Sequence, residues 1–159
     1  MKKLLFILIA IVFGFFFACK ASSDKNEEAT SAADQQHTTY TAENGHTIGM
    51  NVKLNNGAKW EANVETTRGI DKMRGHLIAF SKNPTVEDYR ALHKQLAVEF
   101  QHILERCTMT GEAHNQLHNY LMPLKGMIDK IGTENLENCN ALLPDLNEYV
   151  LKFSHFFFT

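Results

Sequence analysis

Neither sign of charge is in excess in this 159-residue sequence, which carries 16 Lys and Arg against 18 Asp and Glu, for a formal net charge of −2 at pH 7. A nucleic-acid-binding domain normally presents a strongly basic face, so this balance argues against that class. The sequence also lacks a Ser-centred elbow, a Gly-rich phosphate loop and a pair of facing carboxylates. We therefore predict that the protein binds no nucleic acid and is not an enzyme.

Two familiar haem and zinc motifs are missing as well. Without CxxCH the chain lacks the usual attachment site for c-type haem, and without HExxH it lacks the zinc-protease pattern. Haem held non-covalently between a His and a Met in a helical bundle remains an alternative, on analogy of fold alone. The apolar content of 44% and the charged content of 21% are close to the globular average, so we expect one folded domain with a tail.

Long apolar runs are scarce: the longest covers residues 4–18 and is short for a membrane span. Because Lys2 and Lys3 precede it, the run has the layout of a signal peptide. It ends in Phe16-Phe17-Ala18-Cys19, which resembles the lipobox of bacterial lipoprotein precursors. The resemblance implies cleavage before Cys19, diacylglycerol on its sulfur and acylation, with palmitate for example, of the new amine. The alternatives are an ordinary signal peptide with Cys19 in a disulfide, or an uncleaved anchor.

The resemblance also implies a location. The protein would be anchored by lipid in the bacterial cell envelope, on the outer membrane at its periplasmic face or at the cell surface. Residues 20–46 contain Tyr40 as their only large apolar side chain, too little apolar surface to offset the entropy of ordering. We therefore predict three parts, which are a signal peptide (1–18), a lipidated Cys with a flexible tether (19–46) and a helical domain (47–159).

Apolar residues recur at helical spacing through most of the third part, which predicts an all-α fold, a four-helix up-down bundle. The first expected helix is capped by Thr66 or Thr67 and ended by Asn83-Pro84, and the second starts at Thr85 with Asp88 in a capping box. The third is expected to run from Thr110 through Pro123 to Gly132. The fourth is expected from Ala141 to Phe157, with Pro144 in its first turn. The expected inward stripes are Ile70, Met73, Leu77 and Phe80; Tyr89, Leu92, Leu96, Phe100, Ile103 and Cys107; Leu117, Leu121, Leu124, Ile128 and Ile131; and Leu146, Val150, Phe153 and Phe157.

A short extended or hairpin segment is expected before the first helix. Residues 50–54 alternate between apolar and polar, and Asn55-Asn56-Gly57 is a turn signal because Asn-Gly readily adopts positive φ. The returning strand would be residues 59–62. An extended loop with Trp60 as a plug is the alternative.

One cluster of residues suggests metal chemistry. His114 and His118 are four positions apart, so both imidazoles project from one helical face. Cys107 and Met109 lie just before this helix and add a thiolate and a thioether. Such a soft, mixed set favours copper, with zinc also possible. His76 or His93 could supply a further ligand. The alternative is structural, with Cys107 and Met109 filling the core and the histidines bonded to backbone or water.

Two other features bear on function. A Cys107–Cys139 disulfide would suit an oxidising compartment, but it conflicts with a bundle in which a helix of about 30 Å separates the two residues. Exposed Phe156 and Phe158 near the C-terminus could dock an envelope protein partner. Our leading hypothesis is a lipid-anchored envelope protein with a non-enzymatic metal-binding role, and the second is an adaptor lipoprotein without metal.

Overall fold

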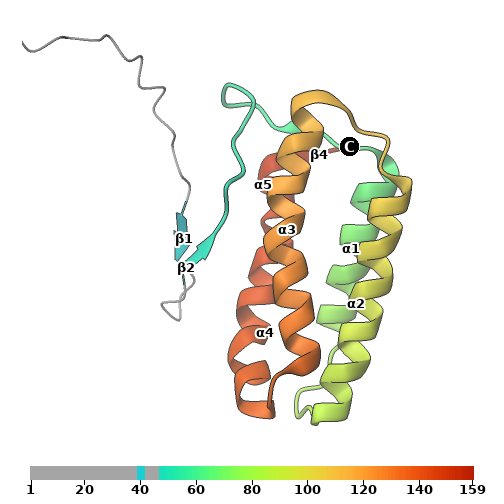
Figure 1. Cartoon of the computed structure of the whole chain (residues 1–159), viewed down its shortest axis with the longest axis vertical. Helices are drawn as coiled ribbons and strands as arrows, with labels where there is room; N and C mark the ends of the chain where they lie inside the picture. Colours follow the sequence, from blue (N-terminus) through green and yellow to red (C-terminus); the bar gives the residue numbers. More distant parts are fainter. Residues whose placement is uncertain (1–38, 42–46) are drawn as a thin grey trace, which may run out of the picture. The chain divides into compact units, whose positions relative to one another are not determined.

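The computed structural model describes residues 39–41 and 47–159, so the predicted signal peptide, Cys19 and most of the tether lie outside the described residues. Helices α1 to α4 pack as an all-α bundle, in which each helix contacts the next along the chain, as predicted (Figure 1). The elements in chain order are β1 (Thr39–Thr41), β2 (Thr47–Gly49), β3 (Trp60–Glu61), α1 (Val64–Ile78), α2 (Val86–Arg106), α3 (Gly111–Thr133), α4 (Leu136–Leu151), α5 (Phe153–Phe156) and β4 (Phe157–Phe158).

The predicted inward stripes form the core of the bundle. All of their residues are buried except Phe80 and Cys107, which are half-buried at the ends of α1 and α2. Helical spacing places such residues on one face, and burying that face supplies most of the stability of a helix in a folded protein. Met50 and Val52, which precede the first helix, are also buried in this core.

The first helix boundaries differ from the prediction. Asn63, not Thr66 or Thr67, occupies the N-cap of α1, and the buried Thr66 hydroxyl donates a hydrogen bond to Asn63 Oδ1 at 2.6 Å. The helix ends at Ile78, before the Asn83-Pro84 pair. By contrast, the predicted capping box of α2 is confirmed, because the Thr85 hydroxyl accepts from the Asp88 N–H at 3.2 Å and Asp88 Oδ2 accepts from the Thr85 N–H at 2.8 Å.

The ends of α3 and α4 correct two further predictions. Helix α3 starts after Thr110 as expected, runs without interruption through Pro123 and ends at Thr133, one residue beyond the predicted Gly132. Helix α4 begins earlier than predicted, because the Asn135 side chain accepts from the Asn138 N–H at 2.9 Å and caps it there. Pro144 therefore lies in the interior of α4 and not in its first turn.

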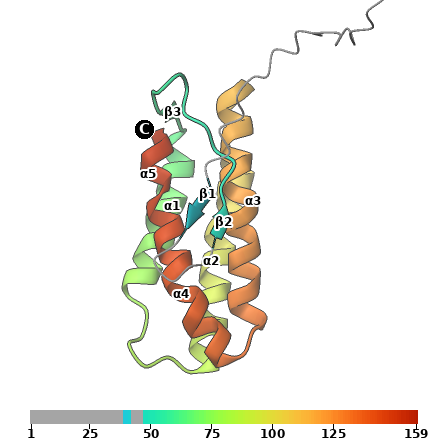
Figure 2. The same cartoon turned by 90° about the vertical axis from the view of Figure 1, so that its left-hand side faces the viewer.

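The segment before α1 contains the predicted turn but not the predicted hairpin. Asn56 and Gly57 have φ angles of 51° and 88°, and the backbones of Asn55 and Ala58 exchange two hydrogen bonds across them. Strand β3 does not pair with residues 50–54. It pairs in parallel with β4 from the far end of the chain, with Trp60 opposite Phe157, and Figure 2 shows β3 at the same end of the bundle as α5. Trp60 is half-buried and its indole N–H donates to the Lys53 carbonyl at 2.6 Å.

Strands β1 and β2 form a separate antiparallel pair, with Tyr40 opposite Ile48. Strand β1 lies in the segment predicted as a tether, so that segment contains a strand where the sequence predicted none. In the described part of the chain, no helix is long and apolar enough to cross a membrane.

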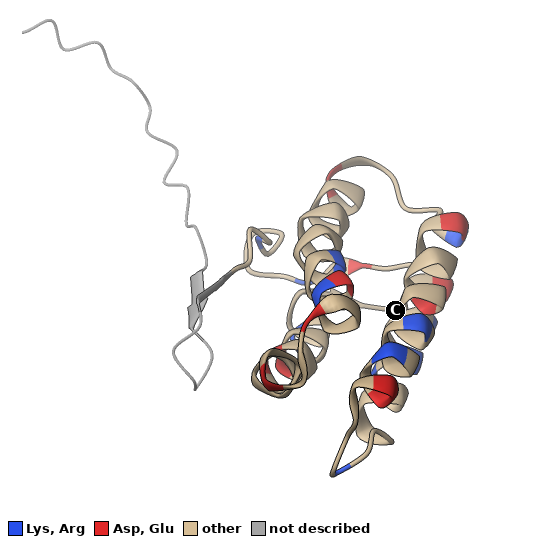
Figure 3. Cartoon of the chain, turned by 60° about the horizontal axis from the view of Figure 1, so that its bottom comes forward, with Lys and Arg blue, Asp and Glu red and all other residues tan. Residues whose placement is uncertain are grey.

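Charged side chains of both signs are interspersed on the helices (Figure 3). Several form ion pairs one turn apart on a single helix, such as Arg68 with Glu65 and Lys125 with Asp129. Pairs of this kind on an exposed surface contribute about 0.3–0.5 kcal/mol each, so they support helices without determining the fold.

Candidate functional site

The site lies where α2 ends and α3 begins. Cys107 is the C-cap of α2 with extended backbone angles, and the chain then reverses over residues 108–110. Gly111 begins α3 with φ of 64°, a conformation that a residue without a side chain adopts readily. This sharp reversal brings the first turn of α3 back over Cys107.

The reversal places a thiol beside an imidazole. Cys107 Sγ lies 3.7 Å from His114 Nδ1, and both residues are half-buried. The ring of His118, one turn further along α3, meets the ring of His114 edge to face with 4.5 Å between centroids. His118 is exposed, so the cluster is closed by Cys107 on one side and open to solvent on the other.

Other side chains hold the first turns of α3 in place. Glu112 accepts hydrogen bonds from Gln116 Nε2 at 2.7 Å and Asn115 Nδ2 at 3.2 Å, which lower the pKa of its carboxyl, that from Gln116 most. The Gln116 carbonyl oxygen in turn accepts from the Lys53 N–H at 2.7 Å. This network ties the segment before α1 to the helix that carries the two histidines. The sequence analysis missed it, although a Gln next to the apolar stripe was a usable signal.

Met109 is not part of the thiol–imidazole cluster. It is half-buried, packs on the core and lines a separate pocket of about 310 Å³ with Ala62, Thr110 and Ala113, among others. Its side chain therefore contacts this pocket and the core.

His76 and His93 are also far from the cluster. Thirteen positions of α2 separate His93 from Arg106, the residue before Cys107, so about 20 Å of helix lies between them. His76 lies in the last turn of α1. The opposite end of this helix is the one near Arg106, because Glu65 in the first turn lies 3.8 Å from the Arg106 guanidinium. Neither histidine can share an ion with Cys107, and the prediction that one of them supplies a further ligand to this site is wrong. His93 instead packs against the backbone of Gly132.

Cys107 and Cys139, the cysteines in the described part of the chain, are both free. Cys139 lies in the first turn of α4, where its thiol donates to the Ile131 carbonyl at 3.4 Å. Burial, followed by the nearby Glu134 carboxylate, raises the pKa of this thiol. Cys139 is therefore a buried structural thiol.

The distance between Cys107 and His114 can be tested against the geometry of a metal site. A metal bound at about 2.3 Å from sulfur and about 2.0–2.1 Å from nitrogen, the values typical of zinc, spans 3.7 Å at an S–metal–N angle of about 115°. That angle lies between the tetrahedral and trigonal values. The same distance also suits a hydrogen bond between a thiol and an imidazole.

The donor set is small. Within residues 39–41 and 47–159, no group of three or more His, Cys, Asp or Glu side chains is arranged to hold a metal ion. The structure thus brings together Cys107 and His114, with His118 adjacent, and leaves the remaining predicted ligands elsewhere. The chain matches no protein-family model, no curated protein and no solved structure.

Proposed function

We propose that the protein is a lipid-anchored protein of the bacterial cell envelope whose helical bundle binds a transition metal ion, copper or zinc, without catalysing a reaction. The observation that carries this proposal is the 3.7 Å distance between Cys107 Sγ and His114 Nδ1. A thiolate and one or two imidazoles are ligands that copper and zinc take readily. In this proposal the exposed His118 ring turns toward the ion to supply a third donor, and water or another molecule completes the coordination.

The exposure of the cluster favours capture and release over permanent storage. A structural zinc site is normally closed by four protein ligands, whereas this cluster brings two donors together, with His118 adjacent, and is open on the His118 side. An ion can therefore enter from solvent and be passed on by ligand exchange. Because thiol and imidazole must lose protons to bind, affinity should fall as the pH falls.

The metal proposal is tested by titrating the full chain, purified in detergent under reducing conditions, with copper(I) and with zinc. Changing His114 and His118 to Ala together should weaken binding by about tenfold or more, and Cys107→Ser should have an effect of similar size. His102→Ala with His155→Ala is the matched control, because these histidines lie elsewhere on the bundle. Unchanged affinity in the first double variant would contradict the proposal and leave the hydrogen bond as the interpretation.

The anchor is supported by the lipobox-like sequence at residues 16–19. Two or more acyl chains hold a protein stably on a membrane, whereas one does so only marginally. Cys19→Ser should leave an uncleaved precursor that carries no lipid, and intact-mass measurement of the wild type should show cleavage before Cys19 and the acyl chains. Release of the wild type without detergent would argue against lipidation.

Of the two aromatic residues on which the adaptor alternative depends, one is exposed and the other is buried. Phe158 is 49% exposed, but Phe156 is buried, so the prediction that both are exposed is wrong for Phe156. A protein partner would therefore have to recognise a surface that includes Phe158 but not Phe156. Loss of co-purifying envelope proteins in Phe158→Ala, with metal affinity unchanged, would favour this second function.

A further inference from the structure

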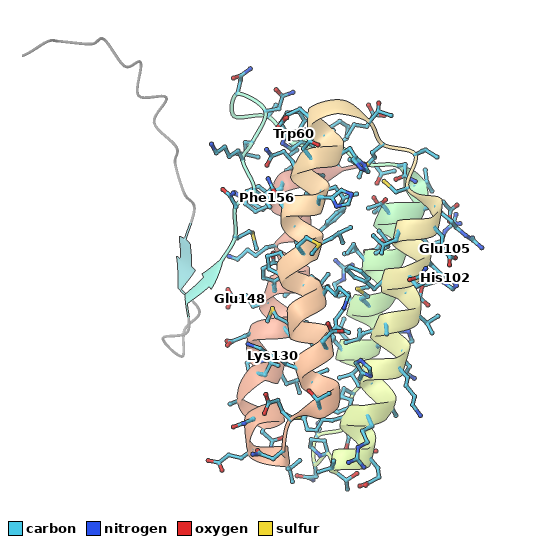
Figure 4. The ribbon with its side chains drawn as sticks, viewed as in Figure 1. Trp60, His102, Glu105, Lys130, Glu148 and Phe156 are labelled. Atoms are coloured by element: carbon cyan, nitrogen blue, oxygen red, sulfur yellow. The ribbon has the colours of Figure 1, made fainter. Side chains whose placement is uncertain are left out.

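A second pocket lies between the end of α3 and the first half of α4, far from Cys107. It has a volume of about 240 Å³ and is lined by Lys130, Glu134, Asn138, Ala141, Leu142 and Asp145. Lys130 lies 16 positions beyond His114 on α3, so about 24 Å of helix separates the two sites. Figure 4 shows Lys130 toward the end of the bundle opposite Trp60.

Asp145 is the unusual residue of this pocket. It is only 4% exposed, and its Oδ1 is buried without a hydrogen-bond partner in the described part of the chain. Removing a carboxylate oxygen from water without giving it a donor is unfavourable, and an unpaired buried group often marks a bound ion, ligand or water. Asp145 is also one of the residues that line the pocket, so its carboxylate is available to a donor group bound there.

The surrounding groups indicate what kind of donor fits. Glu134 is a second carboxylate in the lining, and one of its oxygens already accepts from Asn138 Nδ2 at 2.9 Å. Two carboxylates against one ammonium leave the pocket with a net negative charge, so a cation is favoured. Ala141 and Leu142 add an apolar wall, which suits a short hydrocarbon chain better than a metal ion that needs oxygen ligands on all sides.

From these observations we infer that the pocket binds a small aliphatic primary amine, whose ammonium group donates to Asp145 and Glu134 while its carbon chain lies on Ala141 and Leu142. The volume is below that of a typical drug-sized site and suits a molecule of a few carbon atoms. The amine could be a simple diamine or an amino acid, which carries a carboxylate as well. This inference is independent of the metal site.

Calorimetric titration of the full chain in detergent tests the inference, with 1,4-diaminobutane and 4-aminobutanoate as the probes. At least one should bind, and Asp145→Asn should weaken it by roughly tenfold to a hundredfold, because a charge-assisted hydrogen bond is lost. Glu134→Gln should weaken it less. Asp129→Asn is the matched control, since this exposed carboxylate lies one position before Lys130 but lines no part of the pocket.

The Lys130→Met variant distinguishes the two kinds of amine ligand, a simple diamine and an amino acid. Removing its positive charge should strengthen binding of 1,4-diaminobutane by relieving repulsion and weaken binding of 4-aminobutanoate by removing a partner for its carboxylate. The inference is overturned if neither probe binds, or if Asp145→Asn and Glu134→Gln, shown to be folded by circular dichroism, both bind as the wild type does. His114→Ala with His118→Ala should leave amine binding unchanged, so failure of either proposal can be distinguished from failure of the other.

Discussion

At the scale of single residues, α2 and α3 are in close contact at His93 and Gly132. A Cβ built on Gly132 would lie 2.4 Å from His93 Cγ, a distance that forces the ring to move. The sequence predicted that Gly132 ends its helix, since glycine commonly does so. The reason for glycine here is close packing against a ring from another helix, which depends on the tertiary arrangement and leaves no local signal.

Gly132→Ala should therefore destabilise the protein by about 1–3 kcal/mol, the usual effect of overpacking a close contact. Gly126→Ala is the matched control on the same helix, where a Cβ meets nothing within 4 Å. It should stabilise the protein by about 0.5–1 kcal/mol, because alanine has the better helix propensity. Denaturant unfolding measures both. Equal effects of the two substitutions would contradict the packing argument, and His93→Ala should remove most of the cost of Gly132→Ala.

At the scale of elements, the caps explain which helix starts could be predicted. The Thr85 and Asp88 pair was recognised because both partners of a capping box are local in sequence and precede an apolar stripe. Asn63 was missed because Thr66 and Thr67 are also good caps, and the bond from the Asn63 amide to the Arg106 carbonyl is formed only in the folded bundle. Asn135 was missed since Gly132 and Pro144 suggested a longer connection.

Thr85→Ala should lower the free energy of unfolding by about 1 kcal/mol, since it removes the hydroxyl that accepts from the Asp88 N–H. Thr110→Ala provides the control, because Thr110 occupies the N-cap of α3 without a side-chain capping bond. Its substitution should change stability by a few tenths of a kcal/mol at most. Thermal unfolding of both variants against the wild type checks the difference, and a loss in Thr110→Ala as large as that in Thr85→Ala would count against it.

The same capping box adds a dependence on pH. Hydrogen bonds from the Thr85 backbone and then from its hydroxyl lower the pKa of Asp88 below its usual 3.8. Because the folded-state pKa is the lower one, the contribution is present above about pH 4 and is lost as the pH falls through the folded-state value. Asp88→Asn should therefore flatten the stability profile in this acidic range, with little change in its shape near neutral pH.

At the scale of the whole molecule, the C-terminal segment closes the bundle against the start of the domain. Strand β4 pairs with β3, the Ala62 N–H donates to the Phe158 carbonyl at 2.7 Å, and the hydroxyls of Thr67 and Thr159 are hydrogen-bonded to each other. Phe157 is 2% exposed and stacks on Phe153 with ring centroids 4.9 Å apart. Periodicity predicted that Phe157 is buried, but it could not reveal the parallel pairing, since that depends on where the two chain segments meet.

Phe157→Ala should destabilise the protein by about 3–5 kcal/mol, because it leaves a cavity among aromatic rings. Phe158→Ala should change stability by no more than about 0.5 kcal/mol, since its ring is half exposed and its hydrogen-bonding group is a backbone carbonyl. Urea unfolding of the two single variants provides the measurement. A large loss in Phe158→Ala would mean that its ring, and not only its backbone, holds the two strands together.

Part of the candidate site could be predicted because its residues are close together in the sequence. His114 and His118 are neighbours through helical spacing alone, and Cys107 reaches His114 across a short reversal. Met109 lies only two positions from Cys107 but faces another pocket. Whether His76 or His93 could reach Cys107 depended on which ends of α1 and α2 lie near the loop before α3. The sequence alone could therefore not exclude them as ligands. Asp145 was overlooked because a single acidic residue in a helix is normally exposed.

The pairing of β3 with β4 also constrains the order of events in biogenesis. Trp60 and Phe157 are 97 positions apart, with all four long helices between them. A ribosome makes the chain from its N-terminus, so β3 emerges long before its partner and must wait, unpaired, while the helices are synthesised. Closing so large a loop is entropically unfavourable until the helices have already collapsed. Assembly of this small sheet should thus be a late event, which follows synthesis and collapse of the four long helices.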